Sequence, residues 1–302
     1  MTAAPPLGRL LTAMVTPFGP TGEVNLDAAQ RLARRLVDDG SEGVVVAGTT
    51  GESPTLSDQE KLELLRAVRE ALPDATVVAG TGGNDTRHSV HLSERAMSAG
   101  ADALLAVVPY YNRPPQEGIL RHFEAISKAG PTIMYNIQGR TAVNMTAETT
   151  LRAAELPGVI GVKEASGDLT QIALICARRP PDFWVWSGDD GMTLPLLSVG
   201  GDGVICVISH LAGAAMARMI QAHLGGDAPA AALIHGRLLP LMRALMTAST
   251  SPIPVKSVLN RLGPDLGGLR LPLLDMPPDA LDGVMAELQA AGDLISIGAP
   301  LG

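Results

Sequence analysis

Eight short apolar segments alternate with amphipathic, helix-like segments along most of the chain. The apolar segments are rich in valine, isoleucine, leucine and alanine, as expected for parallel strands that are covered on both faces. They are residues 10–15, 43–47, 76–79, 103–108, 132–135, 159–163, 183–186 and 204–207. Eight such strand–helix units are typical of the α/β class and predict a (β/α)8 TIM barrel. A doubly wound open sheet is the alternative, but it usually has fewer units and a phosphate-binding fingerprint.

Capping signals mark the helices between these strands. Ser57-Asp58-Gln59-Glu60 has the form of a capping box, and Gly100 is a typical helix stop. Helices are predicted over residues 25–40, from 57 onward, over 86–99, 116–129, 146–155 and 169–178, and from about 192. No strand is predicted beyond about residue 228, where residues 231–245, 255–262 and 279–291 are helix-like. We therefore expect a catalytic barrel over residues 1–225 and a C-terminal helical extension over residues 226–302.

Composition excludes several classes of function. The formal charge is −8 and the basic residues are scattered, which argues against binding to nucleic acid or to an anionic membrane. No apolar run reaches the length of a membrane span, and residues 1–11 lack the apolar core of a signal peptide. The two cysteines, Cys176 and Cys206, sit in apolar runs and indicate no disulfide framework. The six histidines form no metal-ligand cluster, so we expect a cytoplasmic protein without metal or cofactor.

Lysine is scarce, and one lysine stands at the end of a predicted strand. The chain has four lysines, and only Lys163 lies against an apolar strand, the run Val159-Ile-Gly-Val-Lys163. Burial of an ammonium lowers its pKa and makes the nucleophilic neutral amine more available. A lysine that snorkels to the surface at a strand end is the alternative for this residue considered alone.

Polar residues gather at the ends of three other strands, which is where active sites of barrels lie. The second strand is followed by a glycine-flanked Thr49-Thr50 turn, whose N–H groups and hydroxyls suit a small carboxylate. An ordinary tight loop is the alternative for that turn. All three tyrosines, Tyr110, Tyr111 and Tyr135, follow the fourth and fifth strands. Together with Lys163, these groups indicate Schiff-base chemistry on a small keto acid, with hydroxyls relaying protons.

Several motifs make the chain resemble a known family. They are Gly48-Thr-Thr-Gly-Glu-Ser53, Pro109-Tyr-Tyr-Asn-Arg-Pro114, Tyr135-Asn136 with Arg140-Thr141, Gly161-Val-Lys-Glu-Ala165, Ser187-Gly-Asp-Asp190 and Pro252-Ile-Pro-Val-Lys256. On these motifs the chain resembles the 4-hydroxy-tetrahydrodipicolinate (dihydrodipicolinate) synthases of the N-acetylneuraminate lyase superfamily, from about Leu10 to Leu274. The resemblance implies a lysine-biosynthetic lyase that condenses pyruvate with L-aspartate 4-semialdehyde in a homotetramer of tight dimers.

The resemblance also implies a role for each matching residue. Lys163 forms the imine with pyruvate, and Tyr135 donates and accepts protons. Thr49 completes the hydroxyl relay with Tyr111, which reaches in from the neighbouring subunit. Thr50 and the backbone of Ile205 hold pyruvate, and Arg140 takes the carboxylate of the semialdehyde, a task suited to a guanidinium. In the Ser187-Gly-Asp-Asp190 motif, we expect the acids to cap a helix.

Two departures from the family pattern bear on specificity. Gln138-Gly139 stand where a proline and a serine are usual, so a differently shaped loop, and with it another 2-keto acid such as a sugar acid, stays open. A catalytically silent carboxylate sensor is a further alternative. The positions that bind feedback lysine in the family are Ser53, Pro54, Asp58, Lys61, Asn84, His88 and Tyr110 here. A cation at Lys61 and no acid at His88 predict weak or absent inhibition by lysine.

Overall fold

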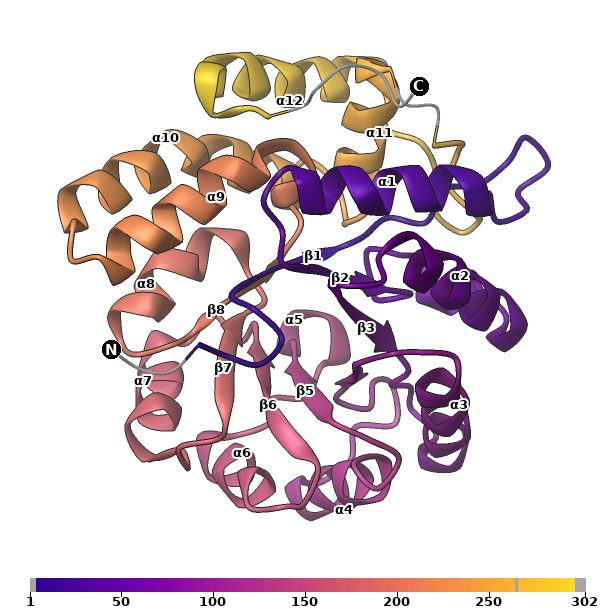
Figure 1. Ribbon diagram of the computed structural model, residues 1–302, viewed down its shortest axis with the longest axis vertical. Helices are drawn as coiled ribbons and strands as arrows, with labels where there is room; N and C mark the ends of the chain where they lie inside the picture. Colours follow the sequence, from indigo (N-terminus) through magenta and orange to yellow (C-terminus); the bar gives the residue numbers. More distant parts are fainter. Residues whose placement is uncertain (1–3, 264–265, 297–302) are drawn as a thin grey trace.

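A closed barrel of eight parallel strands forms the centre of the computed structural model, which describes residues 4–263 and 266–296 (Figure 1). Each strand pairs with the next along the chain, and the last pairs with the first. The strands are β1 (Leu10–Ala13), β2 (Gly43–Val46), β3 (Thr76–Gly80), β4 (Ala103–Val107), β5 (Thr132–Asn136), β6 (Val159–Glu164), β7 (Trp184–Ser187) and β8 (Gly203–Cys206). The predicted (β/α)8 TIM barrel is confirmed.

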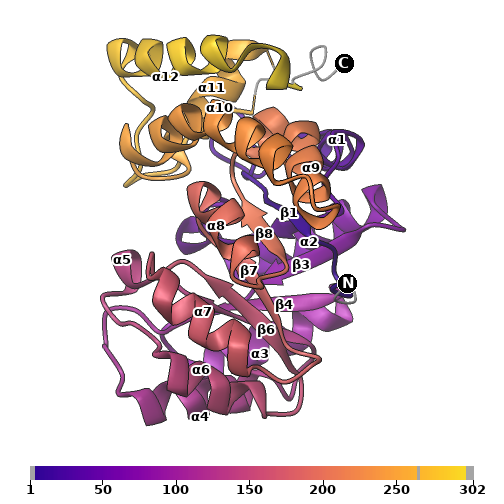
Figure 2. The same cartoon turned by 90° about the vertical axis from the view of Figure 1, so that its left-hand side faces the viewer.

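Helices surround the strands, and the last three lie together at one end of the long axis of the molecule (Figures 1 and 2). They are α1 (Leu26–Asp38), α2 (Asp58–Ala71), α3 (Thr86–Ser98), α4 (Gln116–Ile126), α5 (Gln138–Thr141), α6 (Ala147–Ala154), α7 (Leu169–Arg178), α8 (Thr193–Ser198), α9 (Ser209–Leu224), α10 (Ala228–Thr247), α11 (Ile253–Leu262) and α12 (Pro278–Ala291). Single 3-10 turns, η1 (Ser53–Thr55), η2 (Asp190–Met192) and η3 (Gly292–Leu294), complete the described elements. In the described ranges, no helix is both long and apolar enough to cross a bilayer.

Local signals fix the helix ends as the sequence indicates. The Ser57 hydroxyl accepts from the N–H of Glu60, and the Glu60 carboxylate accepts from the N–H of Ser57, so the capping box of α2 is present. Gly100, just past α3, has φ +101°, the left-handed stop that glycine favours. Two helices have no counterpart in the sequence prediction. One is the single-turn α5; the other is α9, which is buried on several sides and lacks the polar stripe that reveals a helix.

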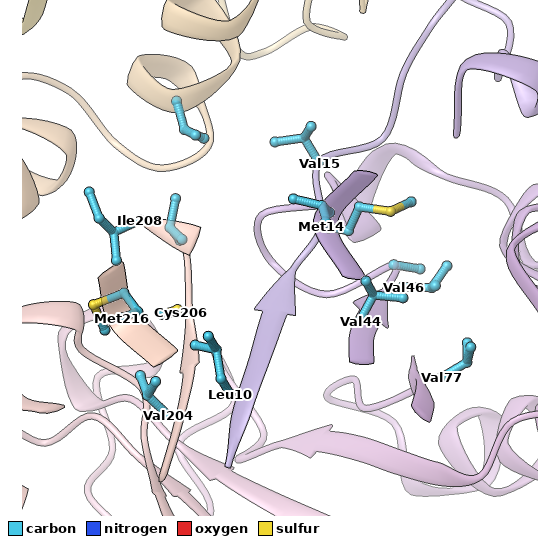
Figure 3. Close-up of a cluster of buried hydrophobic side chains, with 14 of the residues drawn as sticks. Leu10, Met14, Val15, Val44, Val46, Val77, Val204, Cys206, Ile208 and Met216 are labelled. Atoms are coloured by element: carbon cyan, nitrogen blue, oxygen red, sulfur yellow. The ribbon is translucent and has the colours of Figure 1, made fainter. Parts of the chain in front are cut away.

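Alternation along the strands divides the core into two parts. Leu10 of β1 and Val204 of β8 point outward to the helices, where Figure 3 shows them in the same cluster as Met216 of α9. Leu11 and Ile205, their neighbours in sequence, fill the interior of the barrel. Because side chains alternate between the two faces of a strand, every second residue of β5 and β6 also faces inward. The inward faces of these two strands carry the site described next.

Candidate active site

Lys163 and Tyr135 face each other inside the barrel. They are paired in register across β5 and β6, and each side chain is about 5% exposed. The Nζ atom of Lys163 lies 4.4 Å from the centroid of the Tyr135 ring, a cation–π geometry. Glu164, the next residue, turns to the outer face, where it accepts hydrogen bonds from Asn136 and Gln171. Strand periodicity alone therefore separates the lysine from the adjacent carboxylate.

The surroundings of Lys163 favour its neutral form. Burial lowers the pKa of Lys163 to about 8, and the charge of Arg140 acts in the same direction. The charge of Asp190 opposes this shift, because a nearby anion favours the ammonium. With this pKa about one amine in ten is uncharged at pH 7, against about one in three thousand for an ordinary lysine. Lys163 is thus equipped to act as a nucleophile.

One small cavity collects most of the predicted site residues. It has a volume of about 30 Å³, and its lining includes Thr49, Thr50, Tyr135, Arg140 and Lys163. Burial raises the pKa of Tyr135, so its phenol stays protonated at neutral pH, while the charge of Arg140 and the nearby Thr49 side chain oppose that rise. A neutral phenol beside a hydroxyl can pass a proton on without carrying a charge. The cavity therefore places the Lys163 amine beside the hydroxyl groups of Tyr135 and Thr49.

Arg140 reaches this cavity from the one-turn helix α5. Gln138 and Gly139, the unusual residues of its loop, form the first half of that turn. The guanidinium Nη2 donates a 3.1 Å hydrogen bond to the carbonyl oxygen of Ser251, which lies two residues before the start of α11. The C-terminal region thereby holds the arginine over the barrel.

Two of the predicted site residues are not in the lining of this cavity. Ile205 is 1% exposed and belongs to the inner core, among residues such as Leu11 and Tyr135. Tyr111 is 90% exposed and has φ +72°, a left-handed conformation unusual for tyrosine. The chain therefore holds Tyr111 out from its own surface and away from the lining of its own cavity.

Asp190 is a site residue that sequence reasoning missed. Its neighbour Asp189 caps η2 as expected, accepting a hydrogen bond from Gly191 at 2.9 Å. Asp190 instead lines the cavity with Lys163 and accepts hydrogen bonds from the N–H groups of Val207 and Ile208. Burial raises its pKa to about 6, and these N–H groups and Lys163 oppose the rise. Its place three residues after the end of β7 was the available signal, because barrel sites form at strand ends.

A second, larger cavity of about 340 Å³ shares Gly48, Thr49, Leu105 and Tyr135 with the first. Its lining contains all seven positions that the sequence assigns to feedback lysine: Ser53, Pro54, Asp58, Lys61, Asn84, His88 and Tyr110. The acid among them, Asp58, is already paired with His88, whose Nε2 lies 2.9 Å from a carboxylate oxygen. Burial lowers the pKa of Lys61. Asp85, which also lines this cavity, accepts hydrogen bonds from the N–H groups of Arg87 and His88. The carboxylates of this wall therefore already have hydrogen-bond partners before an incoming ammonium group arrives.

Comparison with known proteins covers nearly the whole chain. The model of the dihydrodipicolinate synthetase family matches residues 6–291. The 4-hydroxy-tetrahydrodipicolinate synthase of Moorella thermoacetica is 52% identical over 288 residues, 94% of this chain and 98% of that protein. The corresponding synthase of Cyanothece sp. is 51% identical over 271 residues, 88% of this chain and 92% of that protein.

Solved structures show the same relationship. The crystal structure of the dihydrodipicolinate synthase (DHDPS) from Cyanidioschyzon merolae, with lysine bound, superposes with a TM-score of 0.92 at 45% sequence identity. The match covers 95% of this chain and 98% of that chain. Sequence and structure thus agree over the barrel and the C-terminal helices alike. This chain belongs to the dihydrodipicolinate synthetase family.

Proposed function

We propose that this protein is a 4-hydroxy-tetrahydrodipicolinate synthase, a class I aldolase-type lyase that condenses pyruvate with L-aspartate 4-semialdehyde. The observation that carries the proposal is the buried Lys163 opposite Tyr135 inside the barrel, with a pKa near 8. Family membership and curated relatives of that name, about half identical to this chain, support the same activity. The product is the cyclic precursor of diaminopimelate and lysine.

The first half of the reaction uses Lys163 as the nucleophile. Its neutral Nζ attacks the keto carbon of pyruvate, and the resulting carbinolamine loses water to give the protonated imine. Loss of a proton from the methyl carbon then gives an enamine, with the iminium nitrogen taking the electron pair. Tyr135, with Thr49 beside it, donates and accepts the protons of these steps. Thr50 and the Ile205 backbone hold the carboxylate of pyruvate.

The second half joins the two substrates. The enamine carbon attacks the aldehyde carbon of the semialdehyde, and Arg140 binds the semialdehyde carboxylate. The amino group of the bound semialdehyde then attacks the imine carbon, which closes the ring and releases Lys163 as the free amine. The position of Arg140 on the cavity wall supports this substrate over a sugar acid, because a cation suits a second carboxylate.

Assembly and location form part of the same proposal. We infer a homotetramer built from tight dimers, in which Tyr111 enters the site of the neighbouring subunit and completes the relay. Its 90% exposure in the single chain supports this, because a relay hydroxyl has to be withdrawn from bulk water. We also infer a cytoplasmic location, supported by two cysteines that are both unpaired. Light scattering coupled to gel filtration measures the assembly.

Turnover of pyruvate with L-aspartate 4-semialdehyde tests the activity, with wild type compared with Lys163→Ala. Wild type is expected to turn over both substrates, whereas the variant, which keeps the fold, is expected to be inactive. Sugar acids serve as competing substrates; a preference for them would replace the proposed reaction with that of a related lyase. Borohydride reduction in the presence of pyruvate should place one reduced adduct on Lys163. A wild-type protein that stays untagged would instead be a carboxylate sensor.

A further inference from the structure

Glu52 closes the turn that carries Thr49 and Thr50. It is 1% exposed, has φ +56°, and donates its N–H to the carbonyl oxygen of Thr49 at 3.1 Å. A residue other than glycine is strained in this left-handed conformation and keeps it only where the surroundings impose it. The geometry of the Thr49–Thr50 turn therefore depends on what holds the Glu52 side chain.

The C-terminal region holds that side chain on both of its oxygens. Lys256 of α11 donates from Nζ to Glu52 Oε1 at 3.0 Å, and Arg270 donates its backbone N–H to Oε2 at 3.0 Å. Lys256 is 1% exposed, so this is a fully buried ion pair. Its ammonium group also lies 4.2 Å from the centroid of the Phe18 ring. Lys256, which lies near the start of a helix predicted from the sequence, thus contacts the Glu52 side chain of the Thr49–Thr50 turn.

A second path runs from Lys256 to the same turn through Thr16. The Nζ atom donates to the Thr16 carbonyl oxygen at 2.8 Å, and the Thr16 hydroxyl donates to the carbonyl oxygen of Gly51 at 2.6 Å. Lys256 is therefore connected to two successive residues of the turn, Gly51 and Glu52. Replacing it is expected to loosen the turn from both directions.

We propose that Lys256 and Glu52 are a positioning pair for the pyruvate site: α11, through this ion pair, holds the Thr49–Thr50 turn in the geometry that imine formation requires. Neither residue touches the reacting atoms, so both act through Thr49 and Thr50. The inference rests on the proposed function, in which these two threonines bind pyruvate and relay protons. It gives the C-terminal helical region a part in the first chemical step.

Three variants separate positioning from simple stabilisation. Lys256→Met keeps the length of the side chain, Glu52→Gln keeps its shape, and the double variant leaves neither charge buried without a partner. The exposed pair Arg261–Asp282, 2.8 Å apart between α11 and α12, provides the matched control as Arg261→Met. For each protein, the KM for pyruvate and the rate of borohydride-trapped adduct formation are measured per folded molecule, with the urea unfolding curve giving the folded fraction.

The double variant leaves no buried charge unpaired, and its reaction with pyruvate is still expected to be impaired. A displacement of about 1 Å can reduce a rate about a hundredfold, so we expect the rate of adduct formation in the double variant to fall at least about tenfold, and its pyruvate KM to rise. The control is expected to keep the wild-type KM. A double variant within about twofold of the wild-type KM would overturn the proposal, whatever its stability.

Thr16→Val is the milder probe if the pair variants do not fold, because it removes only the hydroxyl bonded to Gly51. Its pyruvate KM is expected to rise severalfold, and an unchanged value would count against the proposal. Failure of the proposed function has a different signature. In that case the wild type itself forms no pyruvate adduct. If the wild type forms the adduct and the variants keep the wild-type KM, only the positioning pair is rejected.

Discussion

Replacing Gly188 by alanine is expected to disable Lys163 while leaving the barrel folded. A Cβ atom at position 188 would lie 3.0 Å from Cε and 3.1 Å from Cγ of Lys163, and 2.9 Å from Cβ of Ala165. The backbone at this position is held in place, because the N–H of Gly188 donates to the carbonyl oxygen of Glu164 at 2.8 Å. The long side chain of Lys163 can give way by rotation, whereas the Cβ atom of Ala165 can move only together with its backbone.

The size of the effect follows from these contacts. Carbon atoms pack best at about 3.5–4.0 Å, so Cε at 3.0 Å has to move by about 0.5–1.0 Å. A misplacement of about 1 Å lowers a rate about a hundredfold, or about 2.7 kcal/mol of transition-state stabilisation. Overpacking of this kind lowers the free energy of unfolding by about 1–3 kcal/mol, which a typical domain tolerates.

The assay is kcat/KM for pyruvate, together with the rate of the borohydride-trapped adduct. Gly283→Ala is the matched control, because position 283 lies on an exposed face of α12 with no atom within 4 Å of the new Cβ. The control is expected to keep wild-type kinetics and to gain up to about 1 kcal/mol of stability from the better helix propensity of alanine.

Two results would refute the reasoning. One is wild-type kcat/KM in a folded Gly188→Ala protein, which would mean that the Lys163 stem needs no clear space on this side. The other is a loss of activity that only follows the loss of folded protein, which would make Gly188 a packing residue with no bearing on the nucleophile.

Four further predictions follow from the site. Tyr135→Phe keeps the ring beside Lys163 and removes the phenol, so kcat should fall by about 10²–10⁴ with little change in melting temperature; activity near wild type would remove Tyr135 from the relay. The kcat/KM for pyruvate should increase with pH along a titration curve whose midpoint lies near pH 8, because the neutral Lys163 amine is the reactive form. Asp190→Asn should move that midpoint to lower pH, since the Asp190 charge raises the pKa of Lys163; an upward shift would contradict this assignment. L-Lysine should inhibit weakly or not at all because of Lys61 in the larger cavity, and half-inhibition at submillimolar concentration would show that prediction to be wrong.

Strand periodicity is why the fold and the centre of the site could be predicted. Apolar runs of strand length are local signals, and so is a lysine at the end of one of them. Once the strands close into a barrel, their ends converge, which brings Thr49, Tyr135, Arg140 and Lys163 to one cavity. Their proximity follows from topology rather than from their spacing in the sequence.

Partners contributed by tertiary packing could not be predicted in the same way. Glu52 and Lys256 are 204 residues apart in sequence, and nothing local indicates that they meet. Asp190 looked like its capping neighbour Asp189, and only the close approach of β8 distinguishes them. The division into a barrel over residues 1–225 and a helical extension over residues 226–302 stays a prediction. The buried ion pair between Glu52 and Lys256 crosses this boundary, so the boundary does not separate two energetically independent parts.

Lys163 and Lys256 are both buried, but their amino groups have different surroundings and are expected to react differently with a reagent. The nitrogen of Lys256 is occupied by Glu52 and Thr16, whereas that of Lys163 rests against the ring of Tyr135, and Lys163 lines the cavity. A survey of amine labelling should therefore not rank these lysines by accessibility. Carbonyl electrophiles small enough to enter the barrel should discriminate between them, which makes reversible covalent inhibition at a single lysine a realistic aim.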